Sequence, residues 1–324
     1  MNSQREFHRK CAIITGGNSG LGFQVAKNIS NETDWRVIVA SRTRDKNLKA
    51  VEKIKRKNQN AMIESRVLDL GSIESIKQFT DWFLNREDIV SLNAIVCNAG
   101  VSISTGTQYT TDGIEKTFGV NHLGHFYLVK LLLPHMSVNG RIVNVTSGVH
   151  NRTDDNPYMK GPRYTDAMTL AYPDKYDQQM GSDESEIGAR RYATSKLCNV
   201  LFTYELDRRL KSGQLKAADG ITVNAYTPGF MPGTDLGRHS KGFSRIMFKY
   251  IFPLFRPLSK NIVSPSESGK VLSEIIISDK YKSVSGKYYE VGREERSSTE
   301  SYNENLAHEL WENSEKIIRT LTRN

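Results

Sequence analysis

The sequence has few cysteines and no long hydrophobic run. Only three of its 324 residues are cysteine, Cys11, Cys97 and Cys198, and this odd, widely spaced set suits neither a disulfide framework nor a cysteine-based metal site. No stretch reaches the roughly 18 consecutive apolar residues of a membrane-spanning helix. The polar, basic start MNSQREFHRK is unlike a signal peptide. These absences indicate a reducing compartment, and we expect the chain to be cytoplasmic.

Internal repeats and low-complexity linkers are also absent, so a single domain over residues 1–324 is the simplest organisation. Hydrophobic residues make up 38% of the chain and charged residues 25%, which suits a globular protein with a full core. The formal net charge of +9 favours anionic partners. We interpret it as the general basicity of a cytoplasmic protein and expect no nucleic-acid site.

Short apolar segments rich in β-branched residues alternate with amphipathic segments. Leu21, Val25 and Ile29 recur at helical spacing, and Ser72 stands at the N-cap position of another helix. This alternation predicts an α/β fold with a doubly wound, mainly parallel sheet of the Rossmann type and helices on both faces. The expected strands are 11–15, 36–40, 65–70, 93–99, 141–147, 221–226 and 287–291.

A glycine-rich turn, TGGNSGLG at 15–22, follows the first expected strand and precedes the first helix. Gly16, Gly20 and Gly22 fall where the chain turns tightly, admits a pyrophosphate and packs closely against the sheet. Free N–H groups of the following helix would bind the phosphates. A purely structural turn is the alternative, but the strand before it and the helix after it favour a dinucleotide site.

The end of the second expected strand indicates which dinucleotide binds. NAD-binding folds place an acidic residue there, whereas this chain has Ser41 and Arg42, followed by Arg44. A guanidinium can bind a 2′-phosphate through paired, charged hydrogen bonds, so we predict NADP(H) as the cofactor. The alternative is that these arginines begin the solvated basic helix at 46–57, and it fits Arg44 better than Arg42.

A tyrosine and a lysine lie four residues apart in RRYATSKLCNV, at Tyr192 and Lys196. This spacing puts both side chains on one helix face, where the ammonium would stabilise the phenolate and lower the tyrosine pKa toward neutrality. The tyrosine would then transfer a proton to or from a substrate oxygen. Alone, such a pair is typical of a solvated helix surface, so its meaning depends on the other motifs.

Seven motifs, from about residue 11 to residue 291, resemble those of the short-chain dehydrogenase/reductase superfamily. They are TGGNSGLG (15–22), LDL (68–70), CNAG (97–100), VNHLGHF (120–126), VTS (145–147), YATSK (192–196) and TPG (227–229). The resemblance implies that the catalytic residues are Asn121, Ser147, Tyr192 and Lys196. The whole expected cofactor site comprises Gly16, Asn18, Ser19, Gly20, Leu21, Gly22, Ser41, Arg42, Asp69, Leu70, Asn98, Ala99, Gly100, Tyr192, Lys196, Pro228 and Gly229.

The segment between Ser147 and Tyr192 is long for this superfamily, and residues 150–191 are polar and rich in turn-forming residues. We therefore expect an insertion at the surface, beside the mouth of the active site. In the superfamily the helix after this segment often forms a dimer face, so the insertion favours a monomer over a homodimer.

The last third of the chain resembles the branch of light-dependent protochlorophyllide reductase, and NHLGHF and SKLCNV are shared with that branch and with retinol dehydrogenases. One departure is Phe230, which follows TPG where the pigment reductases have a cysteine near the substrate. A phenyl ring cannot donate a proton, but it can line an apolar substrate pocket. The scaffold is therefore shared, and we predict no pigment photochemistry.

Residues 235–265 are expected to form a lid segment. Within it, 238–260 contains no acidic residue and places arginines and lysines at helical spacing beside an apolar side. This pattern suits a lid over an apolar substrate, or a helix that lies on a membrane surface. The two interpretations are compatible if the substrate is lipid-like, so a peripheral membrane contact stays open.

Two further features do not require a functional role. His122 and His125 lie three residues apart in an apolar helix, and without further ligands of matching geometry we assign them to packing or capping and predict no metal site. The amphipathic segment 303–316 is interpreted as a helix packed on the domain rather than one that binds a partner.

The sequence therefore predicts an NADP(H)-dependent oxidoreductase that transfers hydride to or from a small hydrophobic carbonyl or alcohol, with Tyr192 as general acid/base. Reduction of a ring double bond in a tetrapyrrole is the alternative that the branch resemblance implies. A non-enzymatic NADP sensor or scaffold would be expected to lack part of the set Asn121, Ser147, Tyr192 and Lys196, which is complete here.

Overall fold

The computed structural model describes residues 10–88, 91–154, 160–176, 180–181, 183–231 and 263–323. Their strands form one eight-stranded sheet of order β3-β2-β1-β4-β5-β6-β7-β8, in which every neighbouring pair is parallel except β7 and β8. The order changes direction between β1 and β4, the position where open α/β sheets bind ligands at the carboxyl ends of their strands. The strands are β1 (Lys10–Thr15), β2 (Trp35–Ser41), β3 (Ile63–Val67), β4 (Ser91–Cys97), β5 (Met136–Val145), β6 (Thr222–Thr227), β7 (Lys287–Glu290) and β8 (Arg293–Glu294).

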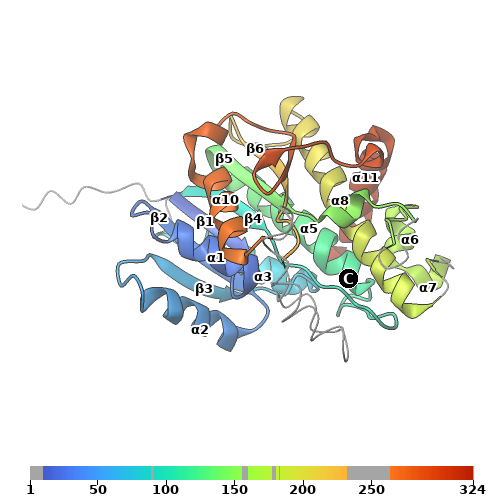
Figure 1. The fold of residues 1–324 in the computed structure, drawn as a ribbon, viewed down its shortest axis with the longest axis horizontal. Coiled ribbons are helices and arrows are strands. Elements are labelled where there is room, and N and C mark those ends of the chain that lie inside the picture. The colour runs from blue at the N-terminus through green and yellow to red at the C-terminus, as the bar shows by residue number, and fades with distance from the viewer. Residues whose placement is uncertain are drawn as a thin grey trace, which may run out of the picture.

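Helices cover both faces of the sheet (Figure 1). Because strand side chains alternate between faces, Ala12 and Ile14 of β1 pack with α1, α2 and α10, whereas Cys11 and Ile13 pack with α3, α5 and α8. The described residues thus form a large hydrophobic core on each side of the sheet. The longer helices are α1 (Gly20–Ile29), α2 (Arg44–Lys55), α3 (Ile73–Leu84), α5 (Gly124–Leu132), α8 (Glu184–Lys211), α10 (Pro265–Ile277) and α11 (Glu304–Arg323).

The C-terminal helix α11 packs on the outer surface of α5 and α8 (Figure 1). Trp311 is only 3% exposed, and its ring meets those of Phe126 in α5 at 5.0 Å and Phe202 in α8 at 5.9 Å. Arg209 of α8 also donates a 2.8 Å hydrogen bond to Glu312. The prediction of a packed helix at 303–316 is confirmed.

The predicted fold class is confirmed, but several boundaries differ from the sequence expectation. The third strand is Ile63–Val67 rather than 65–70, because its pairing with β2 ends at Val67, and β5 begins at Met136 rather than at 141. The two-residue antiparallel strand β8 has no pattern that would reveal it. Ser72 does cap α3, since its hydroxyl accepts a 3.2 Å hydrogen bond from the Ser75 N–H.

The expected insertion at 150–191 contains two short helices, α6 (Ala167–Ala171) and α7 (Pro173–Tyr176). Its last residues, 184–191, belong instead to α8, because Asp183 caps that helix by accepting a 2.9 Å hydrogen bond from the Glu186 N–H. The lid expected at 235–265 and its basic part at 238–260 lie outside the described residues, apart from 263–265. Within the described ranges, none of the helices has the length and apolar character needed to cross a membrane.

Candidate active site

Ser147, Tyr192 and Lys196 come together where β5 ends beside α8. Ser147 lies two residues beyond β5, and its hydroxyl is hydrogen-bonded to the Tyr192 phenol. Lys196 follows one helical turn later, with its Nζ 5.6 Å from the centre of the tyrosine ring and 3.2 Å from the Val145 carbonyl oxygen. Ser147 and the Tyr192–Lys196 pair, which are distant from each other in sequence, thus share one site at the carboxyl edge of the sheet.

Asn121 lies beside these three residues, in a π-helical turn over Gly119–Leu123 that joins α4 (Lys116–Phe118) to α5. Its buried side chain pairs with the Val101 backbone, accepting from the N–H at 2.7 Å and donating to the carbonyl at 2.9 Å. It also donates a 2.9 Å hydrogen bond to the Ser195 hydroxyl of α8. π-Helical turns often occur at functional sites, and this one directs Asn121 toward α8.

The electrostatics of the Tyr192–Lys196 pair differ from the sequence expectation. Burial raises the pKa of Tyr192 to about 12, and the hydrogen bond with Ser147 opposes this shift only in part. Burial lowers the pKa of Lys196 to about 8, because the apolar surroundings disfavour the ammonium. The predicted tyrosine pKa near neutrality is therefore wrong for the protein alone. At neutral pH the tyrosine holds its proton, as a proton donor must.

The glycine-rich turn between β1 and α1 has the close approaches that a dinucleotide site needs. Gly16 and Gly20 have φ angles of 64° and 54°, which favour glycine. A Cβ at Gly22 would lie 2.6 Å from the Gly16 carbonyl oxygen, so only glycine fits there. Ser19 is the N-cap of α1, but its side chain makes no capping hydrogen bond. The first N–H groups of α1 therefore lack a side-chain cap, and the turn fits a phosphate group.

Thr15, which the sequence analysis did not single out, holds this turn against the loop after β4. Its hydroxyl oxygen accepts hydrogen bonds from the Asn98 N–H at 2.9 Å and the Ala99 N–H at 3.0 Å. The Asn98 side chain donates in return to the Thr15 carbonyl at 2.8 Å. Gly100 follows, and a Cβ there would lie 3.5 Å from Lys196 Nζ. The loop therefore joins the glycine-rich turn to the residues around Lys196.

The residues expected to bind the adenosine part of the cofactor lie at the ends of β2 and β3. Ser41 is half-buried and hydrogen-bonded to the buried Asn47, whereas Arg42 is exposed. Asp69 is half-buried and accepts a 3.0 Å hydrogen bond from the Gly71 N–H. Among the described residues no ion-pair partner of Arg42 is found. Arg42 is thus placed to meet a ligand charge in solvent.

The other predicted cofactor residues lie in the same segments. In the glycine-rich turn Asn18 is half-buried and Leu21 is buried, and Leu70 is buried after β3. Pro228 is buried directly after β6, and Gly229 follows with a φ of 77°. Phe230, the predicted pocket residue, is half-buried, and its carbonyl accepts a 3.0 Å hydrogen bond from the Val263 N–H.

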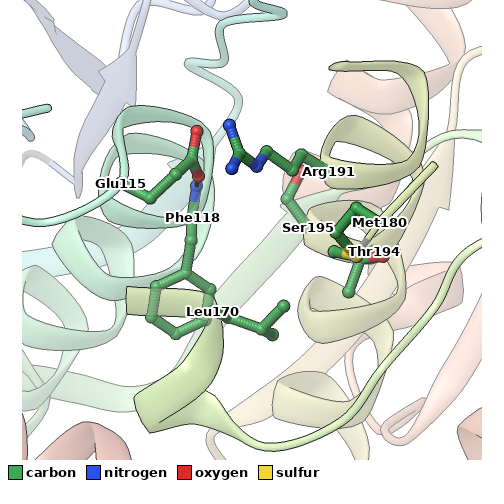
Figure 2. Close-up of a pocket in the computed structure, with 7 residues that line it drawn as sticks. All are labelled: Glu115, Phe118, Leu170, Met180, Arg191, Thr194 and Ser195. Atoms are coloured by element: carbon green, nitrogen blue, oxygen red, sulfur yellow. Dashed lines mark hydrogen bonds between the residues drawn. The ribbon is translucent and has the colours of Figure 1, made fainter. Parts of the chain in front are cut away.

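A small pocket is bordered by the α8 residues Arg191, Thr194 and Ser195 (Figure 2). Burial raises the pKa of Glu115, and the nearby Arg191 guanidinium, which points toward it in Figure 2, opposes this shift. The Glu115 carboxylate accepts hydrogen bonds from the Thr117 and Phe118 N–H groups at 3.0 and 2.8 Å, so it caps the helix that leads to Asn121. The pocket is lined by Glu115, Phe118, Leu170, Met180, Arg191, Thr194 and Ser195.

The two histidines assigned to packing or capping differ in their surroundings. It is buried among Phe118, Phe126 and Phe202, and its Nε2 lies 3.0 Å from the Ser314 hydroxyl of α11. His125 instead joins the site, with hydrogen bonds to Thr15 and to the Asn121 carbonyl. In the described part of the chain, no cluster of three histidine, cysteine or acidic side chains is arranged to hold a metal ion.

Comparison with known proteins finds relatives over nearly the whole chain. Residues 10–164 match the family model of the short chain dehydrogenases. Retinol dehydrogenase 13 of Mus musculus is 33% identical over 320 residues, which cover 95% of this chain and 84% of that protein. Protochlorophyllide reductase of Avena sativa is 32% identical over 323 residues, covering 94% and 98%. WW domain-containing oxidoreductase of Gallus gallus is 32% identical over 317 residues, covering 97% and 69%.

Solved structures have the same fold. A putative uncharacterized protein of Mycobacterium paratuberculosis aligns with a TM-score of 0.61 at 25% identity, over 96% of this chain and 93% of that chain. A variant of actinorhodin polyketide ketoreductase with NADPH aligns with a TM-score of 0.60 at 20% identity, over 89% and 98%. The second likeness concerns the fold alone.

Proposed function

The chain belongs to the short-chain dehydrogenase/reductase family, and we propose from this premise that it is an NADP(H)-dependent reductase of hydrophobic carbonyl compounds. The observation that carries the proposal is the Ser147–Tyr192 hydrogen bond, with the Lys196 ammonium group 5.6 Å from the tyrosine ring. A protonated phenol, held by a neighbouring hydroxyl group and near a buried cation, is suited to donate a proton to a carbonyl oxygen.

In the proposed reaction a carbonyl compound becomes an alcohol. Tyr192 donates its proton to the carbonyl oxygen, and the Ser147 hydroxyl orients that oxygen by hydrogen bonding. Lys196, whose pKa is about 8, carries a positive charge at neutral pH that stabilises the phenolate left by the proton transfer. When bound, the reduced nicotinamide supplies the hydride that adds to the carbonyl carbon. Solvent then returns a proton to Tyr192, and the same residues serve the reverse oxidation.

The residues available for the cofactor fit a dinucleotide with a 2′-phosphate. Gly16, Gly20 and Gly22 leave room for a pyrophosphate at the N-terminus of α1. Arg42 is exposed beside the end of β2, without a described ion-pair partner, where a guanidinium would bind the extra phosphate. We therefore assign NADP(H) rather than NAD(H) as the preferred cofactor.

Substitution of Arg42 by aspartate tests this assignment. The change removes the proposed phosphate ligand and adds a repelling charge, so NADPH affinity should fall roughly 10- to 100-fold, as expected for the loss of a charged hydrogen-bonded pair. NADH affinity should stay the same or improve. Fluorescence titration of the purified variant with each cofactor measures both constants.

Arg44→Asp is the matched control, because Arg44 is also exposed but begins α2 two residues later. It should change the NADPH to NADH ratio far less than Arg42→Asp. If the Arg42 variant lost equal affinity for NADPH and for NADH, this arginine would support the fold and would not select the cofactor.

The substrate class follows from Phe230 and from the relatives. Protochlorophyllide reductase and retinol dehydrogenase 13 carry names of large, apolar compounds, and Phe230 offers an aromatic ring rather than a proton donor after β6. We propose retinoid-like aldehydes or ketones as substrates, and reduction of a tetrapyrrole ring as the second candidate.

Illumination separates the two candidate substrates. Protein and NADPH should oxidise the cofactor in the dark when retinal or another hydrophobic aldehyde is added, and should leave protochlorophyllide unchanged in the light. Absorbance spectra before and after illumination show whether NADPH is oxidised and whether protochlorophyllide is converted. Efficient formation of chlorophyllide, without dark aldehyde reduction, would replace the first candidate by the second.

We also propose that the chain is a monomer. The face formed by α5 and α8 is covered by α11 of the same chain, through Trp311 and the Arg209–Glu312 ion pair, so these helices are not free to pair with a second copy. Light scattering of the purified protein tests this, and a stable dimer mass would contradict it.

A further inference from the structure

Two buried histidines each connect a proposed catalytic residue to a distant segment of the chain. His125 and His150 are 2% and 1% exposed. Both place Nδ1 against the backbone carbonyl oxygen of a proposed catalytic residue, Asn121 at 3.0 Å and Ser147 at 2.7 Å. Because a carbonyl only accepts hydrogen bonds, Nδ1 must carry the proton in both rings. Nε2 is then free to accept a hydrogen bond from elsewhere.

The hydrogen bonds around Thr15 favour a neutral His125. Its Nε2 lies 2.8 Å from the Thr15 hydroxyl oxygen, which already accepts hydrogen bonds from the Asn98 and Ala99 N–H groups. The hydroxyl oxygen thus accepts two hydrogen bonds, and its one proton has two acceptors, His125 Nε2 and the Val96 carbonyl oxygen at 3.1 Å, of which the ring nitrogen is the nearer. Through this bond His125 joins Asn121 to the loop and the glycine-rich turn proposed to hold the cofactor.

His150 makes the corresponding connection for Ser147. Its Nε2 accepts a 3.3 Å hydrogen bond from the Ser298 N–H, 148 residues later in the chain, and its ring packs against Tyr288 of β7 at 5.2 Å. A protonated ring would set an N–H against the Ser298 N–H. The neutral ring instead fixes the turn after β5, where the Ser147 side chain meets Tyr192.

We propose that His125 and His150 are positioning residues, which hold the backbone of Asn121 and of Ser147 as neutral imidazoles protonated on Nδ1. This inference rests on the proposed function of the site. Loss of the His125–Asn121 or the His150–Ser147 hydrogen bond would let the side chain of that catalytic residue shift relative to Tyr192. Small displacements of this kind lower rates strongly. His122 differs, because its bond goes to Ser314 of α11 and its Nδ1 has no partner in the described residues.

The surroundings of both rings favour the neutral form. Burial lowers the pKa of His125 to about 4, and the positive charge of Lys196 on α8 adds to this effect, whereas the bond to Asn121 opposes it. Burial also lowers the pKa of His150, against the bond to Ser147. His122 is the other titratable group near His125. Because these pKa values lie below the ordinary histidine value, the histidines stabilise the fold above pH 6.5 and lose this effect as the pH falls toward 4.

Paired substitutions separate positioning from simple structural support. Asparagine keeps an N–H near the place of Nδ1, so His125→Asn and His150→Asn retain a donor for the catalytic residue's carbonyl. Glutamine keeps an acceptor near the place of Nε2, so His125→Gln and His150→Gln retain the bond to Thr15 or Ser298 and lose the first bond. His122→Asn and His122→Gln form the control pair at a buried histidine without a bond to the catalytic residues.

We expect the two members of the His125 pair, and of the His150 pair, to differ in kcat more than in stability. The glutamine variants of His125 and His150 should lose roughly 10- to 100-fold in kcat, with KM for the aldehyde changed little, while the asparagine variants stay within a few-fold of wild type. The melting temperatures of the two variants should fall by similar amounts. The His122 pair should show no difference in kcat between its members.

Asparagine and glutamine variants with equal kcat at either position would overturn the inference for that histidine. An equal loss of kcat in the His122 pair and the other pairs would also overturn it, because burial alone would then explain the effect. NADPH binding, followed by fluorescence, shows that each variant is folded. If Tyr192→Phe were as active as wild type, the proposed function would fail instead, so the two failures are distinguishable.

Discussion

Replacement of Tyr192 by phenylalanine is expected to lower the rate of carbonyl reduction about 10²- to 10⁴-fold, the usual contribution of a general acid. The phenol hydroxyl is the proposed proton donor, and Ser147 holds it. The phenyl ring retains the packing on α8, so the fold and NADPH affinity should change by no more than a few-fold. The loss should appear in kcat, because the proton is transferred in the transition state.

The measurement compares steady-state reduction of a confirmed aldehyde by wild type and variant, with NADPH affinity from fluorescence. Tyr289→Phe is a suitable control, because Tyr289 is a buried tyrosine of β7 outside the site. A Tyr192→Phe enzyme that kept half of the wild-type activity would remove Tyr192 from the proposed role.

Replacement of Lys196 by methionine is expected to lower kcat on the order of 10²- to 10³-fold, as for the loss of one preorganised electrostatic group. Methionine fills similar space on the buried face of α8 but lacks the ammonium that would stabilise the Tyr192 phenolate. The wild-type rate should also fall as the pH rises through about 8, where Lys196 loses its proton. Below that pH the lysine is charged, so its titration should no longer change the rate.

A pH–rate profile of both proteins tests this prediction. The alkaline decrease near pH 8 should be present in wild type and absent from the residual activity of Lys196→Met. If the variant kept the same alkaline decrease, another group would be titrating, and Lys196 would not supply the charge.

Much of the site could be predicted because its residues lie at strand ends and in short motifs. The alternation of apolar and amphipathic segments predicted a parallel sheet but not its strand order. It also placed Ser147 at the end of the fifth expected strand, 141–147, and the glycine-rich turn directly after the first. Parallel strands bring their carboxyl ends to one edge, so these residues meet even though they are distant in sequence. The proximity of Tyr192 and Lys196 could be predicted from their spacing on one helix alone, without knowledge of the tertiary structure.

The remaining features depend on contacts that no local pattern reveals. Thr15, His125 and His150 act through hydrogen bonds to residues 83 to 148 positions away. In sequence they look like an ordinary strand residue, helix residue and loop residue, respectively. The predicted pKa of Tyr192 was wrong because the spacing of residues reveals the nearby lysine but not how deeply the tyrosine is buried. Burial is the largest cause of the raised pKa. Similarly, the start of β5 at Met136 depends on its pairing with Leu92 of β4.

The most direct test of the central claim is transfer of isotope from cofactor to product. NADPH deuterated at the transferable position of the nicotinamide is incubated in the dark with the protein and retinal, and the product alcohol is analysed by mass spectrometry. We predict that wild type yields retinol carrying one deuterium, and that Tyr192→Phe, although it binds NADPH, yields almost none. Alcohol without deuterium, or equal labelled product from both proteins, would contradict the account.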